Sequence, residues 1–183
     1  VQLLHSEFNM NNKKLGRHVM AFAEAHNALA PEQLGSRKNH QSVSVALDKQ
    51  PMMDLLRQRR QAGALCANDA KSCHDRIVHN VGALALRRSG MASAPINSMF
   101  ETLQRATHHV STAFGVSKRS HGDRRVVALQ GAAQPVWAVV STVIIAVMAT
   151  HGHGFNMLSA LSSLLVSLVC CAFVDDTDVI HSA

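Results

Sequence analysis

The feature that most constrains this 183-residue chain lies near its C-terminus, where a long apolar run ends in two adjacent carboxylates. Residues 157–174 are mostly apolar, Asp175 and Asp176 follow, and the apolar pair 179–180 comes shortly afterwards. An apolar strand that enters an acidic turn and leaves as a second strand places carboxylates at the edge of a core. With a third carboxylate from elsewhere, two such aspartates can hold a pair of divalent metal ions.

The candidate for the third carboxylate is Asp69, because a short apolar strand beginning at Ala64 leads into it and Asp75 follows six residues later. Helical spacing of apolar residues and proline positions predict helices elsewhere. The predicted helices cover residues 1–30, 41–62, 77–88, 96–107 and 136–149. Alternating apolar residues predict a β-hairpin formed by residues 110–116 and 126–129, and residues 157–174 are predicted to form a buried strand.

Composition indicates one folded domain, or part of one, with a polyanionic partner. Apolar residues make up 47% of the chain and charged residues 16%, so a disordered tail is excluded. The net charge of +6, with twelve further histidines, makes nucleic acid the first candidate partner. A basic protein without such a partner remains the alternative. The first residues lack a signal-peptide pattern, and the absence of an initiating methionine suggests a fragment.

The four cysteines have no zinc-site spacing and are predicted to be reduced core residues of an intracellular protein. A membrane alternative comes from two apolar segments, residues 136–150 and 157–174, which could form an apolar hairpin. The first is short for a membrane span and the second is at the lower limit. Because the second carries four serines and runs directly into two aspartates, a buried helix and a buried strand are the preferred interpretation.

Four motifs in order resemble those of reverse transcriptases, closest to the non-LTR retrotransposon and group II intron kind. Residues 173–176 (Phe-Val-Asp-Asp) resemble the aromatic-x-Asp-Asp box, and residues 69–75 resemble the first palm motif, which begins and ends with aspartate. Residues 33–37 (Gln-Leu-Gly-Ser-Arg) resemble the fingers motif Gln-x-Gly-Phe-Arg, and residues 130–135 resemble a Gln/Gly/Pro loop. Each motif alone is weak, but their order over nearly the whole chain indicates common ancestry.

The resemblance implies an α+β fold, namely a right-hand polymerase palm in which an antiparallel sheet is backed by helices. Residues 1–62 would form partial helical fingers and residues 63–183 the palm, with the thumb missing. The implied function is that of an RNA-directed DNA polymerase domain. Its partners would be an RNA template, a DNA primer and deoxynucleoside triphosphates. No membrane is expected, and the expected location is intracellular, in the cytoplasm or nucleus.

The resemblance also assigns roles to three carboxylates. Asp69, Asp175 and Asp176 would be catalytic and would ligate two Mg²⁺ ions, or Mn²⁺ in their place. Two such ions make a primer 3′-hydroxyl nucleophilic and neutralise the pyrophosphate that leaves. Magnesium suits this arrangement because it binds through a few carboxylates together with water and phosphate oxygens.

Four further residues would bind the incoming nucleotide. Arg37 and Lys38 would neutralise the triphosphate from the fingers, while Gln134 would belong to the loop that supports the nascent base pair. His74 stands where the family has Phe or Tyr, the ring that excludes a 2′-hydroxyl. Because histidine is smaller and polar, we expect weaker discrimination between deoxyribonucleotides and ribonucleotides.

The sequence departs from the family pattern in further places. Ser36 replaces the fingers phenylalanine, and Gln134 runs straight into Pro135, which leaves the Gln/Gly/Pro loop short. The later palm motifs and the thumb are also absent from residues 1–183. Two alternatives therefore stay open beside the polymerase: a non-catalytic nucleic-acid-binding relic of a retroelement, and a small membrane protein with an apolar hairpin.

Overall fold

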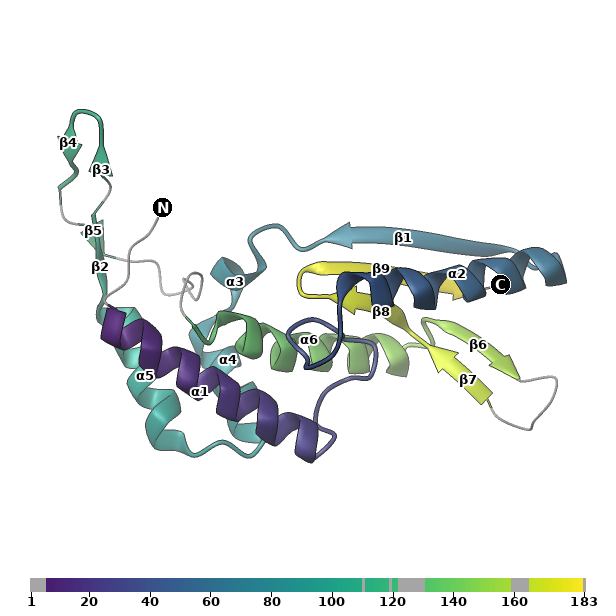
Figure 1. Ribbon diagram of the computed structural model, residues 1–183, viewed down its shortest axis with the longest axis horizontal. Helices are drawn as coiled ribbons and strands as arrows, with labels where there is room; N and C mark the ends of the chain where they lie inside the picture. The colour runs from purple at the N-terminus through teal and green to yellow at the C-terminus, as the bar shows by residue number, and fades with distance from the viewer. Residues whose placement is uncertain (1–5, 110, 119, 122–130, 159–164, 183) are drawn as a thin grey trace. The chain divides into compact units, whose positions relative to one another are not determined.

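The computed structural model describes residues 6–109, 111–118, 120–121, 131–158 and 165–182, which form helices and short antiparallel strands (Figure 1). The α+β class is therefore confirmed. The chain divides into two compact units, residues 1–28 with 72–140 and residues 29–71 with 141–183. These units do not coincide with the fingers and palm boundaries expected from the sequence, and that functional division stays a prediction.

The first unit is largely helical. It contains α1 (Ser6–Ala25), α3 (Cys73–Arg76), α4 (His79–Arg88), α5 (Ser93–Arg105) and the beginning of α6 (Ala133–Thr150). The apolar stripe predicted for α5 is confirmed, since Ile96, Met99, Phe100 and Leu103 are all buried. These residues recur every three or four positions, so that they share one face of the helix.

The hairpin predicted from residues 110–116 and 126–129 is wrong in its first half. Its turn lies inside the first segment, because β3 (Ser111–Thr112) pairs with β4 (Gly115–Val116). The Thr112 hydroxyl accepts from the Phe114 amide and donates to the Gly115 carbonyl, and Gly115 has a φ of +122°. The alternating apolar residues of this segment are typical of a strand, so the turn formed by the Thr112 hydroxyl was not predicted. Outside it, β2 (Thr107–His108) pairs with β5 (Ser120–His121), while residues 126–129 lie outside the described residues.

The second unit contains a three-stranded antiparallel sheet in the order β1–β9–β8 and a separate β6–β7 hairpin. The elements are α2 (Ser42–Arg59), β1 (Gly63–Asp69), β6 (Phe155–Leu158), β7 (Leu165–Leu168), β8 (Cys170–Phe173) and β9 (Asp176–Ser182). The prediction of one buried strand over residues 157–174 is wrong, because the described part of that segment holds portions of three strands. Eighteen extended residues would span about 60 Å, far more than a small sheet can use.

The two faces of the β8–β9 hairpin pack against different helices, and Figure 1 shows α2 running alongside these strands. On one face Cys171 and Ile180 join Val45, Met52 and Leu56 of α2 in a buried cluster. The other face carries a second cluster, formed by Val169, Cys170, Ala172 and Ile145 of α6. Side chains alternate between the two faces of β8, which explains this division. Packing on both faces holds the hairpin, and the acidic turn lies at its end.

Helix α6 bears on the membrane alternative. By length and composition alone, Ala133–Thr150 could cross a membrane, and 39% of this 18-residue helix is buried within the protein. The second segment of the predicted apolar hairpin forms strands in its described part rather than a second helix. In addition, the Thr142 hydroxyl accepts a hydrogen bond from the Ala30 amide, so α6 also holds the loop before α2.

The cysteines differ in exposure, which corrects the prediction that all four lie in the core. Cys66 on β1 is exposed, whereas Cys73, Cys170 and Cys171 are buried, and none of the four forms a disulfide. Burial raises the pKa of Cys170 to about 12 and that of Cys171 to about 11. Both thiols are therefore protonated at pH 8, and the thiolate is the form that reacts.

We expect one thiol to react rapidly with Ellman's reagent at pH 8 in the native protein, and four after denaturation. Cys66→Ser should remove the rapid phase, whereas Cys73→Ser should leave it unchanged, because Cys73 is already inaccessible. A second rapid equivalent in the wild-type protein would contradict the burial of the β8 cysteines.

Candidate active site

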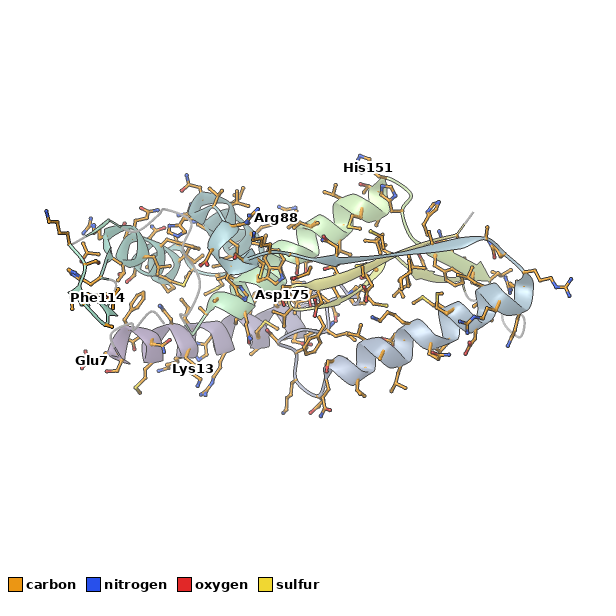
Figure 2. All side chains as sticks on the ribbon, turned by 90° about the horizontal axis from the view of Figure 1, so that it is seen from above. Glu7, Lys13, Arg88, Phe114, His151 and Asp175 are labelled. Atoms are coloured by element: carbon orange, nitrogen blue, oxygen red, sulfur yellow. The ribbon has the colours of Figure 1, made fainter. Side chains whose placement is uncertain are left out.

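The acidic turn connects β8 to β9 as the sequence predicts. Phe173 pairs with Asp176 across the hairpin, and Val174 and Asp175 form the turn between them. Figure 2 shows Asp175 at the end of the hairpin. Val174 has a φ of +55°, a conformation that is unfavourable for a β-branched residue and costs on the order of 1–3 kcal/mol. The turn therefore needs support from its surroundings.

That support comes from Gln33, a fully buried residue of the loop before α2. Its Oε1 accepts from the Val174 amide at 3.2 Å, and its Nε2 donates to the Val174 carbonyl at 3.3 Å. The same side chain also accepts from the Gly35 amide at 2.9 Å and donates to Ser141 Oγ of α6 at 3.0 Å. One buried amide therefore ties the turn to the loop and to α6.

The loop itself lies against β8 as a short additional strand. Gln33 forms a parallel bridge with Ala172, the Leu34 amide donates to the Ala172 carbonyl, and the Ala172 amide donates to the Glu32 carbonyl. At Gly35 the approach is closer still, because an added Cβ would lie 2.2 Å from the Val174 nitrogen. Only glycine allows this contact, which gives the motif at residues 33–37 a clear structural role.

Strand β1 brings Asp69 beside the turn. In the antiparallel register Asp69 lies directly opposite Asp176, and the Ala70 amide donates to the Asp175 carbonyl at 3.1 Å. Residues directly opposite in antiparallel strands have their side chains on the same face, with Cβ atoms about 4.5–5.5 Å apart. The sequence prediction that Asp69 joins the acidic turn is thus matched by the register, while its catalytic role stays a prediction.

A pocket of about 430 Å³ lies on this face, bounded by β1, the β8–β9 hairpin and α2. Asp69, Asp176 and Asp178 line it together with Lys49 of α2. Lys49 Nζ forms an ion pair with Asp178 Oδ2. Three carboxylates and one ammonium leave the pocket acidic, which favours a cation or a cation-bound anion as its ligand.

The donor chemistry of the site suits magnesium, since Asp69, Asp175 and Asp176 offer oxygen ligands and all three are at least partly exposed. Within the described residues, however, no group of three or more His, Cys, Asp or Glu side chains is placed to hold a metal ion. Protein carboxylates would thus supply part of the coordination, and water and phosphate oxygens would supply the rest.

The other predicted site residues are distributed over both units. Arg37 donates from Nη1 to the Ala30 carbonyl at 3.5 Å, which places its guanidinium against its own loop, and Lys38 is exposed. His74 lies in α3 with its ring nearly perpendicular to that of Trp137, and Gln134 is exposed in the first turn of α6. His74 and Gln134 belong to the first unit, and the aspartates belong to the second.

Sequence reasoning missed three residues of this site. Asp178 follows Asp176 by two positions in a strand, so the period of two could have placed both on one face. Lys49 and Ser141 carry no such signal, because their contacts join positions more than a hundred residues apart.

No protein-family model matches the sequence, and no curated protein matches it. Among solved structures the chain is similar to a telomerase from Candida albicans in complex with the TWJ fragment of telomeric RNA. The TM-score is 0.55 with 12% sequence identity, over 93% of this chain and 30% of the telomerase chain. The chain shares its fold with part of a telomerase. It spans less than a third of that protein's length.

A second solved structure is the apo telomerase from Candida tropicalis truncated from its C-terminal domain. Its TM-score is 0.49 with 14% identity, over 94% of this chain and 34% of that chain. The fold likeness therefore rests on the Candida albicans structure, and at 12% identity it concerns the fold alone.

Proposed function

We propose that this chain is the fingers and palm part of an RNA-directed DNA polymerase domain derived from a non-LTR or group II intron-like retroelement. The observation that carries the proposal is the pairing of Asp69 with Asp176 across β1 and β9, beside the turn that holds Asp175. The fold likeness to a telomerase, a reverse-transcriptase-related enzyme solved with RNA, supports it. The basic composition suits a template and primer.

In this proposal Asp69, Asp175 and Asp176 would hold two Mg²⁺ ions, or Mn²⁺. When bound, the ions supply activation of the primer 3′-hydroxyl and neutralisation of the leaving pyrophosphate. Gln33 keeps Asp175 in position by fixing both backbone polar groups of Val174. Arg37 and Lys38 contact the triphosphate, and the protein works in the cytoplasm or nucleus.

The test is primer extension on an RNA template with a DNA primer and deoxynucleoside triphosphates. We expect extension in the presence of Mg²⁺ or Mn²⁺ and its loss when EDTA is added, because the carboxylates alone cannot neutralise the pyrophosphate. Ca²⁺ at the same concentration is the matched control for divalent charge, since its larger radius and flexible coordination suit the site poorly.

A second candidate function is a non-catalytic relic that binds nucleic acid through its basic surface. It is favoured by the finding that, in the part of the chain that the structure describes, no three ligating side chains form a metal site. Binding of RNA without any metal-dependent extension would select this candidate over the polymerase.

A further inference from the structure

A second pocket, of about 370 Å³, lies between α1 and α5 in the first compact unit. This volume is within the range of small-molecule sites, about 300–1,000 Å³. On the α1 side Phe8 and Asn12 line it, and on the α5 side Ser98 and Met99 do so. Phe8 and Asn12 are four positions apart and therefore share one face of α1. The acidic pocket is lined by residues of the other unit, and no described residue lines both pockets.

Asn12 gives the pocket an unused hydrogen-bonding group. Its side chain is 4% exposed, and within the described part of the chain its Nδ2 meets no hydrogen-bond partner. A buried donor without a partner is destabilising, and native proteins rarely keep one without a reason. Nδ2 itself is closed to solvent, but Asn12 lines the pocket, so a turn of its side chain toward a bound ligand would bring Nδ2 to an acceptor.

Basic side chains of α1 lie beside this pocket. Lys13, Lys14, Arg17 and His18 are all exposed on α1, and Lys14 and His18 are among the lining residues. Figure 2 shows Lys13 projecting from the helix. Residues four positions apart are neighbours on a helix surface, so these side chains form a basic face next to the pocket. We call Lys13, Lys14, Arg17 and His18 the basic face of α1.

We propose that the pocket binds one unstacked base of single-stranded RNA, while the basic face of α1 contacts the adjoining phosphates. Single-stranded RNA is recognised by bases that lie against aromatic side chains and form hydrogen bonds through their edges. Phe8 and Met99 supply apolar contacts for the face of the base, and Asn12 and Ser98 supply polar groups for its edge. The inference shares with the proposed function only the premise that the chain binds RNA.

The test measures binding of a fluorescently labelled single-stranded RNA of about 12 nucleotides by anisotropy, in EDTA and without nucleotides. We expect Asn12→Leu to raise the Kd about tenfold, with the same salt dependence as the wild-type protein, because no phosphate contact is lost. Its thermal unfolding midpoint should not fall, since an unpaired buried amide is replaced by an apolar side chain of similar size.

Two comparisons distinguish the contribution of the base to binding from the contribution of the phosphates. Arg17→Gln should lower the slope of log K against log salt by about one, whereas Arg59→Gln, an equal loss of charge from α2 in the other unit, should leave the slope unchanged. An RNA of the same length with abasic sites throughout should bind the wild-type protein about tenfold more weakly than the intact RNA. This last measurement needs no variant and so does not depend on the folding of Asn12→Leu.

The proposal is overturned if the abasic RNA binds as tightly as the intact RNA, or if a folded Asn12→Leu protein binds RNA like the wild type. If only the proposed polymerase function is wrong, the results differ. Primer extension is then absent, while RNA binding in EDTA is still weaker for Asn12→Leu than for the wild type.

Discussion

Replacing Asp175 by asparagine is expected to reduce Mg²⁺-dependent primer extension by about a hundredfold or more. Asparagine keeps the shape of the side chain but removes the negative charge with which the turn would bind a metal ion. Asparagine is also common in turns, so the β8–β9 hairpin should still form. The measurement is the initial rate of extension at saturating primer, with thermal unfolding recorded for the same preparation.

The matched control is Asp54→Asn, which removes one carboxylate from α2. Asp54 accepts from Gln50 and Arg57 on its own helix and does not line the acidic pocket. Its substitution should leave the extension rate within about twofold of the wild type. Extension that survives in Asp175→Asn would show that the activity arises elsewhere or comes from a contaminant.

The second large effect is expected from Gly35→Ala, which should lower the free energy of unfolding by about 3 kcal/mol. The new Cβ would lie 2.2 Å from the Val174 nitrogen and 2.9 Å from Gln33 Oε1. Neither neighbour can withdraw without breaking the hydrogen bonds that hold the acidic turn. For a chain of this length we expect the melting temperature to fall by roughly 6–12 °C.

Gly152→Ala separates this clash from the general effect of adding a methyl group to a glycine. Gly152 has a φ of +75° and no atom within 4 Å of an added Cβ, so only backbone strain of about 1 kcal/mol is expected. Equal destabilisation by the two substitutions, measured by thermal unfolding, would show that the close approach of Gly35 to Val174 is not tight in solution.

The acidic hairpin was predictable from the sequence because its signals are local. An apolar run, two aspartates and a further apolar pair define a strand, a turn and a second strand without reference to the rest of the chain. The helical stripe of α5 was predictable for the same reason, since Ile96, Met99, Phe100 and Leu103 repeat at helical spacing. Asp69 was predicted to join the turn because a short apolar strand leads directly into it.

The interactions that hold the site in place could not be predicted in this way. Gln33 has an ordinary position in a polar loop, and its importance arises only when Val174 and Ser141 come within hydrogen-bonding distance. Likewise Cys66 is exposed because all seven residues of β1 are exposed, on both faces of the strand, which depends on what packs against the strand rather than on its sequence. Contacts between distant parts of the chain decide both features.

The position of β1 also determines the order of events during synthesis. Its sole partner among the described strands, β9, begins more than a hundred residues later, since Asp69 pairs with Asp176 and Gly63 with Ser182. At about 5–20 residues per second, a nascent chain presents an unpaired strand with exposed Ala64, Leu65 and Cys66 for several seconds. Until β1 pairs with β9, the unpaired strands of two newly made chains can pair with each other instead. We therefore expect the yield of folded protein to rise with the supply of chaperones.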